Sequence, residues 1–211
     1  MHAPIRLRAR GFTIIELMVV IALVGVLIAL VAPSLRGMVS AQRVRGVNAE
    51  LVTDLQYARS EAARRNRDVR VAFRAASSLT CYVLYVQADG LPVEDPELVN
   101  GGGAKCDCGR SGAPGDPVCI SEPGREEIKT VRVPRSSGVT LGVTSDDGPI
   151  LAFGRTAGRL VPLSAAGTPP DAFVVLVAGD PRGQLQTTVN EAGRPSVCSP
   201  DDSISGVSST C

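Results

Sequence analysis

The sequence predicts an α+β fold in which one long N-terminal helix packs on an antiparallel β-sheet or sandwich. Three observations predict it. An apolar run covers residues 12–32 with a single charge, Glu16, and an amphipathic pattern with helical spacing continues to residue 66. Short segments with alternating apolar residues then follow to the end of the 211-residue chain.

A short basic segment precedes the apolar run. Residues 1–11 contain Arg6, Arg8 and Arg10 and no acidic residue, so we expect this end to stay in the cytoplasm. As a helix, residues 12–32 would be about 31 Å long, close to the hydrocarbon thickness of a bilayer. We therefore expect a single-pass membrane protein, with the remainder of the chain on the side opposite the cytoplasm.

Two other interpretations of the apolar run compete with this one. A cleavable secretory signal has an apolar region of about 7–15 residues and a small-x-small cleavage site, whereas here Pro33 directly follows the run. A plain signal anchor leaves Glu16 unexplained, because an ionisable group in an apolar segment costs free energy unless it has a partner or lies near the interface. Glu16 is therefore a candidate functional residue.

The residues around Glu16 resemble a known processing signal. The stretch from Gly11 to Ala22, GFTIIELMVVIA, follows a short basic leader and is similar to the prepilin signal of type IV pilins and type II secretion pseudopilins. The resemblance implies that a prepilin peptidase cuts between Gly11 and Phe12 and methylates the new amine of Phe12. It also implies that Glu16 pairs with this amine, or with that of a neighbouring subunit, during filament assembly.

The predicted helix has a membrane half, residues 12–33, and an amphipathic half, residues 34–66. Pro33 removes a helical hydrogen bond, so we expect a kink or a loosened turn there. Beyond it, an apolar stripe should pack on a globular domain: Val44, Val47, Leu51, Leu55, Ala58 and Ala62. We expect four arginines to face water or filament neighbours: Arg36, Arg43, Arg45 and Arg59. Asn66 is the predicted stop.

Residues 67–211 are predicted to form the β-rich periplasmic domain. Alternating apolar residues begin at Val69, and turn residues such as those at 147–149 and 179–181 separate the segments. We expect six or seven short strands, including residues 82–86, 128–133, 139–143, 150–153, 173–177 and 185–189.

Three further stretches resemble the H-type minor pseudopilins (GspH) and the FimT-like minor pilins. They are residues 55–67, residues 150–154 with Gly158, and residues 191–194 after the expected final strand. The resemblance implies a pilin-like fold and a low-abundance structural subunit near the filament tip. Its partners would be other pseudopilins or minor pilins, and it would have no cofactor and no catalytic site. A secretion pseudopilus and a type IV pilus both remain open.

The alternative function is a DNA-uptake receptor. FimT-like members that take part in DNA uptake end with Gly-Arg-x-Arg, whereas this chain has Gly193-Arg194-Pro195-Ser196, so Arg194 is a candidate DNA contact without its second arginine. A second cluster comprises Arg64, Arg65, Arg67, Arg70 and Arg74. We interpret it as a solvated face, because the chain without its leader has 19 basic and 21 acidic residues and few aromatic residues.

The six cysteines all follow the membrane half and their number is even, which favours disulfides in an oxidising periplasm. By resemblance to the C-terminal bridge of many pilins, Cys198 is expected to pair with Cys211. Neighbours in a C-x-C sequence rarely pair, so Cys106 and Cys108 should reach Cys119 and Cys81 in one order or the other. A metal site of Cys106, Cys108 and Cys119 is the weaker alternative, because it lacks a histidine.

The sequence contains no nucleophile elbow, P-loop or zinc-protease signature, and its one histidine is His2 in the expected leader. We therefore expect a structural protein without a catalytic, cofactor or metal site, and a signal-anchored periplasmic enzyme is the remaining alternative. Residues 95–124, rich in Gly, Pro and Asp, form a candidate loop for contact with a partner.

Overall fold

A computed structural model describes residues 12–87, 106–109, 118–119, 125–144, 148–163, 167–180, 183–208 and 211, apart from the side chains of residues 31–36. It divides into two compact units, Met1–Met38 and Val39–Cys211. The leader, including Gly11, lies outside the described residues, as does most of the 95–124 segment.

The α-helix of the described residues, α1 (Ile14–Arg65), has 52 residues. It ends where the sequence predicts, because Asn66 adopts the left-handed conformation with φ of 51°. The amide of Arg67 then donates to the carbonyl of Ala62 at 3.2 Å, which satisfies an end carbonyl of the helix. The helix runs through Pro33, whose side chain is outside the description. The kink therefore stays a prediction.

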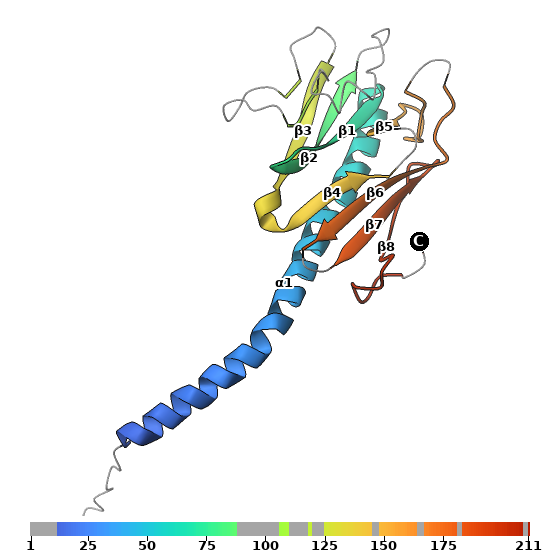
Figure 1. The fold of residues 1–211 in the computed structure, drawn as a ribbon. Coiled ribbons are helices and arrows are strands. Elements are labelled where there is room, and N and C mark those ends of the chain that lie inside the picture. The colour runs from blue at the N-terminus through green and yellow to red at the C-terminus, as the bar shows by residue number, and fades with distance from the viewer. Residues whose placement is uncertain are drawn as a thin grey trace, which may run out of the picture. The chain divides into compact units, whose positions relative to one another are not determined.

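The described residues of the second unit form eight strands, arranged in two antiparallel four-stranded sheets (Figure 1). The first sheet has the order β3-β2-β1-β5, with β1 (Val69–Ala75), β2 (Leu79–Gln87), β3 (Arg125–Pro134) and β5 (Ile150–Phe153). The second has the order β4-β6-β7-β8, with β4 (Val139–Val143), β6 (Ala172–Gly179), β7 (Gln184–Asn190) and β8 (Pro195–Cys198). A short 3-10 helix, η1 (Arg135–Ser137), joins β3 to β4. The predicted α+β class is confirmed.

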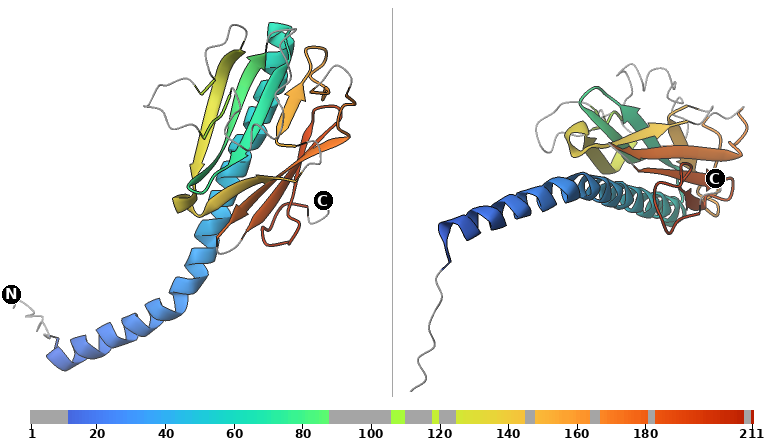
Figure 2. Two further views of the ribbon diagram at one scale, coloured as in Figure 1. Left: turned by 45° about the horizontal axis from the view of Figure 1, so that its top comes forward. Right: turned by 60° about the horizontal axis from the view of Figure 1, so that its bottom comes forward.

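One expectation is wrong: the strand that precedes residues 191–194 is not the final strand of the chain. β7 ends at Asn190, and the chain turns there and returns as β8, so β7 is not the last strand. β8 contains only four residues and begins with a proline, which suits an edge strand but gives no alternating pattern to detect. In both views of Figure 2 the C-terminus lies beside the orange-to-red strands of this second sheet.

The main core lies between the second-unit part of α1 and both sheets. The helix contributes the predicted stripe, with Val44, Leu51, Leu55, Ala58 and Ala62 buried and Val47 partly buried. The ring of Phe73 on β1 lies 5.7 Å from those of Tyr82 on β2 and Phe173 on β6. Aromatic contact therefore joins the two sheets.

A smaller core covers the other face of the first sheet. It contains Ala72, Val83, Tyr85 and Ile150 together with four of the cysteines. Those cysteines pair as Cys81–Cys108 and Cys106–Cys119. The order that the sequence left open is thereby settled, and the alternative metal site is excluded because its three cysteines are in disulfides. The third bridge, Cys198–Cys211, is the one implied by the resemblance.

Candidate functional site

The first candidate site is the start of α1. The hydroxyl of Thr13 accepts a hydrogen bond from the amide of Glu16 at 3.2 Å, and the carbonyl of Thr13 accepts from the amide of Leu17 at 3.1 Å. Thr13 is thus the N-cap, with Glu16 in the first turn, the spacing of a capping box. Phe12 lies just outside the helix and is 77% exposed. Pairing of Glu16 with the amine of a cleaved Phe12 remains a prediction.

The apolar side chains that follow are exposed in this chain. From Ile14 to Leu30, the large hydrophobic residues are between 45% and 79% exposed. Such a continuous apolar surface is rare on a soluble monomer and marks contact with another protein or a membrane. Within the described parts of the chain, we find no helix whose length and apolarity suffice to cross a bilayer.

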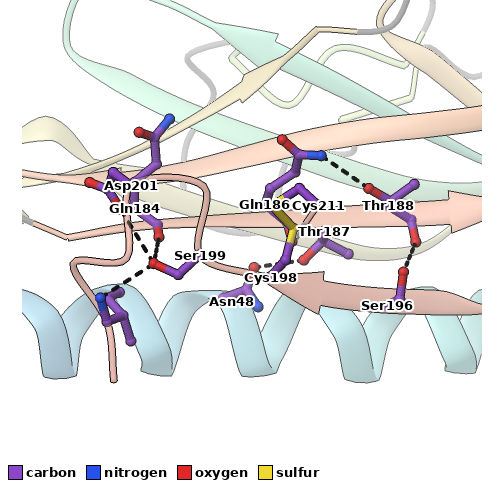
Figure 3. The surroundings of a disulfide bond; sticks show 11 residues. Asn48, Gln184, Gln186, Thr187, Thr188, Ser196, Cys198, Ser199, Asp201 and Cys211 are labelled. Carbon is purple, nitrogen blue, oxygen red and sulfur yellow. Dashed lines mark hydrogen bonds between the residues drawn. A yellow bond between two sulfur atoms is a disulfide. The ribbon is translucent and has the colours of Figure 1, made fainter. Parts of the chain in front are cut away.

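The second candidate site is the buried side of α1, where polar residues interrupt the apolar stripe. Asn48, 3% exposed, accepts a hydrogen bond from the hydroxyl of Thr187 on β7 at 2.7 Å. Figure 3 shows this pair beside the Cys198–Cys211 disulfide. Ser40 donates to the carbonyl of Asp180 at 3.2 Å. Both contacts connect α1 to the second sheet.

Asp54 makes the corresponding contacts with the first sheet. Its carboxylate is buried and accepts hydrogen bonds from the hydroxyl of Tyr82 and from the ammonium of Lys129, both at 2.8 Å. Burial and the bond to Asp54 raise the pKa of Tyr82, and the hydrogen bond from Lys129 to Asp54 raises the pKa of Lys129. Tyr82 and Lys129 are therefore held protonated. The buried carboxylate of Asp54 has hydrogen-bond partners, and the charge of Lys129 compensates its own charge.

Near its C-terminal end, α1 carries a charged network centred on Glu61. The buried carboxylate accepts from Arg64 at 2.7 and 2.8 Å and from Arg65 at 2.6 Å, and Arg65 also reaches Glu126 on β3 at 2.7 Å. Hydrogen bonds from Arg64 and Arg65 lower the pKa of Glu61 to about 2. The network attaches the end of the helix to β3.

The three stretches of the GspH-like and FimT-like resemblance meet in the structure. Arg59 of α1 donates to the carbonyls of Ala157 and Gly158 at 3.3 and 3.2 Å, in the turn that follows β5. Gly193, in the turn between β7 and β8, has φ of 71°, and a β-carbon there would overlap the carbonyl oxygen of Gly158. Arg159 forms an ion pair with Glu191 across the same two turns. The backbones approach too closely for any residue but glycine at position 193.

Three of the arginines expected to face water or filament neighbours also bind loop carbonyls of the globular unit. Besides Arg59, Arg43 donates to the carbonyl of Ser137 at 2.9 Å and Arg45 to that of Ser205 at 2.7 Å. Their long side chains cross from the exposed side of the helix to loop carbonyls, which the helical pattern alone does not reveal. The side chain of Arg36 is outside the description.

The arginine cluster interpreted as a solvated face is only partly so. Arg64 is exposed, but Arg65 is mostly covered between Glu61 and Glu126. Arg74 forms an ion pair with Asp107, which lies between Cys106 and Cys108 in the sequence. Arg70 is half-buried and donates to the carbonyl of Leu163 at 3.5 Å. The interpretation was wrong for these three, because carboxylates and carbonyls distant in sequence fold onto them.

Arg194, the candidate DNA contact, lies in the turn between β7 and β8. Its backbone amide donates to the side-chain oxygen of Asn190 at 3.0 Å, and the residue is exposed. Arg67, two residues after the end of α1, is half-buried. The DNA contact stays a prediction.

A family model described as Type II transport protein GspH matches residues 48–193. The chain belongs to this family. The matched range begins at Asn48 and ends at Gly193, so it contains the buried contacts of Asn48, Asp54 and Glu61 and the close approach of the two turns. The GspH-family chain also matches the prokaryotic N-terminal methylation motif over residues 6–32. The resemblance inferred from the sequence is confirmed.

Among solved structures, this GspH-family chain is similar to the type IV minor pilin FimU of Pseudomonas aeruginosa strain PAO1. In one crystal form, the likeness covers 74% of this chain and 88% of FimU at 18% identity, with a TM-score of 0.47. In a second form it covers 72% and 90% at 18% identity, with a TM-score of 0.41. No curated protein matches the chain.

Sequence reasoning missed Thr13, Asn48 and Asp54. The signal for Thr13 was present, because Thr13 and Glu16 have the spacing of a capping box before an apolar run. Asn48 and Asp54 lie on the buried side at helical spacing from Val44 and Leu51, but a search for apolar periodicity passes over them.

Proposed function

We propose that the protein is a minor, structural, non-enzymatic subunit of a type II secretion pseudopilus, or of a related type IV pilus. The observation that carries the proposal is the contrast within α1. Its apolar residues 14–30 are exposed, whereas its later residues are fixed to a β domain by specific contacts. An exposed apolar helix of this kind requires lipid or other helices around it, which a membrane precursor and then a filament would supply.

The precursor would be processed before assembly. Residues 1–11 would be the leader, removed by a prepilin peptidase between Gly11 and Phe12, with the new N-terminus methylated. Residues 12–33 would lie in the inner membrane with the N-terminus in the cytoplasm, since Arg6, Arg8 and Arg10 precede them. Residues 34–66 would continue the helix, and residues 67–211 would form the periplasmic domain.

The chemistry of Glu16 supports a role in assembly. Cleavage would place an ammonium group on Phe12, next to the positive end of the α1 dipole, where a cation is disfavoured. A carboxylate in the first turn would compensate for both charges, and in apolar surroundings this pairing would be stronger than in water. An unpaired Glu16 among other apolar helices would be costly, so the pairing would also select the depth at which a subunit joins its neighbours.

The proposal is tested by mass spectrometry and cross-linking of the full chain in its own cells. We expect the mature protein to lack residues 1–11 and to carry one methyl group on Phe12. Glu16→Ala should be processed normally but should lose its cross-links to other subunits. Glu50→Ala, which removes a half-exposed carboxylate elsewhere on α1, is the matched control and should assemble normally. An intact Met1, or normal cross-linking of Glu16→Ala, would contradict the proposal.

A further inference from the structure

A row of three residues crosses the first sheet where the Cys-Asp-Cys segment, residues 106–109, is attached to it. Arg74 on β1 and Arg132 on β3 are the register partners of Cys81 on β2. Directly opposed residues of antiparallel strands present their side chains on the same face of a sheet. Cys81 forms its bridge with Cys108 from this face, with one arginine on either side of it.

Asp107 makes the charged contact between the Cys-Asp-Cys segment and this row. Its carboxylate is buried, and one oxygen forms an ion pair with Arg74 while the other accepts a hydrogen bond from the amide of Gly109 at 2.8 Å. A β-carbon on Gly109 would press on the side chain of Arg74. The place of Asp107 therefore requires a negatively charged acceptor, and the place of Gly109 leaves no room for a side chain beside the ion pair.

The backbone of the segment is fixed to the same row. The carbonyl of Cys108 accepts a hydrogen bond from the guanidinium of Arg132 at 2.9 Å. With a contact on each side, Cys108 is held opposite Cys81, and Cys106 pairs with Cys119.

Loop length does not decide which cysteine of the segment bonds to Cys81. If Cys106 and Cys108 exchanged their partners, each closed loop would change by only two residues. The entropy of loop closure varies with the logarithm of the loop length, so it is almost the same for the two pairings. The choice between them must therefore come from the contacts of residues 106–109.

The alternative pairing would shift the segment by two residues along the row. Lys105, which precedes Cys106 in the sequence, would then take the place of Asp107 opposite Arg74. Two cations would face each other, and an ammonium group cannot accept the hydrogen bond that the carboxylate accepts. Asp107 itself would take the place of Gly109 and bring a side chain against Arg74. The order Lys-Cys-Asp-Cys-Gly thus favours one pairing and penalises the other.

We propose that the Arg74–Asp107 ion pair selects the disulfide pairing on the first sheet. Asp107 is a positioning residue for this modification, since it determines which thiol meets Cys81, and Lys105 opposes the alternative. This inference does not use processing or filament assembly, so it can fail while the proposed function stands.

A chain with the alternative bridges can reach the native ones by thiol–disulfide exchange without net oxidation. A glutathione thiolate attacks the sulfur of Cys119 in a Cys108–Cys119 bridge and releases the Cys108 thiolate. Cys108 attacks the sulfur of Cys81, which forms the native bridge and releases the Cys106 thiolate. Cys106 then attacks Cys119 and expels glutathione. All four cysteines are buried in the folded protein, which protects the native bridges from further attack.

The test follows oxidative refolding of the reduced full chain in detergent micelles with reduced and oxidised glutathione. Mass spectrometry with fragmentation of the bridged peptides measures the ratio of Cys81–Cys108 to Cys81–Cys106. The unaltered chain should form the Cys81–Cys108 bridge almost completely. Asp107→Ala should lower the ratio about tenfold or more, the effect of losing a hydrogen bond between charged groups. Glu191→Ala removes an ion pair elsewhere in the domain and is the matched control, with an unchanged ratio.

A second variant separates selection from a general loss of stability. Lys105→Asp and Asp107→Lys together keep the composition and place the carboxylate where the alternative pairing needs it. This variant should form more of the Cys81–Cys106 bridge than Asp107→Ala does, whereas a merely destabilised chain would show no such direction. The C-terminal bridge should form in every variant. An unchanged ratio in Asp107→Ala, or no further rise of Cys81–Cys106 in the charge-exchanged variant, would overturn the proposal.

Discussion

The two parts of α1 differ in what their side chains contact. From Ile14 to Leu30 the helix is apolar on every side and exposed, and its one carboxylate lies in the first turn. From Ser40 to Ala62 it has a buried side in which apolar residues alternate with Asn48 and Asp54, each bonded to a named partner in a sheet.

This contrast shows that one continuous helix can combine a part that packs non-specifically with a part that packs specifically. The first part has area to bury but no directional contacts, so it can pack against many apolar surfaces. The second part has hydrogen bonds to fixed positions on two sheets. A rotation of the helix would leave these buried polar groups without partners, and each unpaired group would lower the free energy of unfolding. The first part suits an environment that changes, and the second suits a fixed attachment.

The largest effect should come from truncating a buried leucine in the second part. Leu51→Ala, at a position that is 0% exposed, should lower the free energy of unfolding by about 2–5 kcal/mol, through lost burial and a residual cavity. Leu23→Ala, at 60% exposed, is the matched control and should change it by less than about 0.5 kcal/mol. Urea unfolding of the full chain in detergent measures both. Equal destabilisation by the two variants would remove the contrast.

A smaller effect is expected when a polar contact of the second part is broken. Asp54→Ala should cost about 1–3 kcal/mol, because the buried hydroxyl of Tyr82 loses its acceptor. A double-mutant cycle with Tyr82→Phe separates this bond from other losses, and the second substitution should cost less when Asp54 is already gone. Additive losses would show that the bond contributes nothing. Thr53→Ala, on the exposed side, is the control.

The smallest effect concerns acid. The arginine bonds lower the pKa of Glu61 from an ordinary 4.5 to about 2 in the folded protein. Its contribution to stability is therefore complete above about pH 4.5 and should be lost as the pH falls towards 2. Glu61→Gln should be less stable at neutral pH and should lack this part of the acid dependence in urea unfolding curves. A variant that kept the same slope between these pH values would show that another carboxylate is responsible.

The elements that repeat a simple period could be predicted from the sequence. The helix from residue 12 to Asn66 followed from an apolar run and an apolar stripe, and Asn66 is one of the few residues that tolerate the left-handed conformation of a helix end. The processing site at Gly11 and Phe12 and the role of Glu16 are predicted from a local motif, and both stay predictions.

The features that depend on distant partners could not be predicted. The sequence around Arg74 is typical of a surface residue, and only the fold brings Asp107 into an ion pair with it. The pairing of Cys81 with Cys108 and of Cys106 with Cys119 likewise depends on contacts between segments distant in sequence. β8 forms because it pairs with β7, and its own four residues show no pattern typical of a strand.

The close approach of Gly193 to the carbonyl of Gly158, with Arg59 donating to that same oxygen, has a consequence for protein engineering. Three segments of the chain, around residues 59, 158 and 193, meet at one oxygen atom, so exchanging any one of them alone should disturb the contact. Chimeras built by grafting α1 from another subunit onto this β domain should express well only if the two turns are transplanted with it.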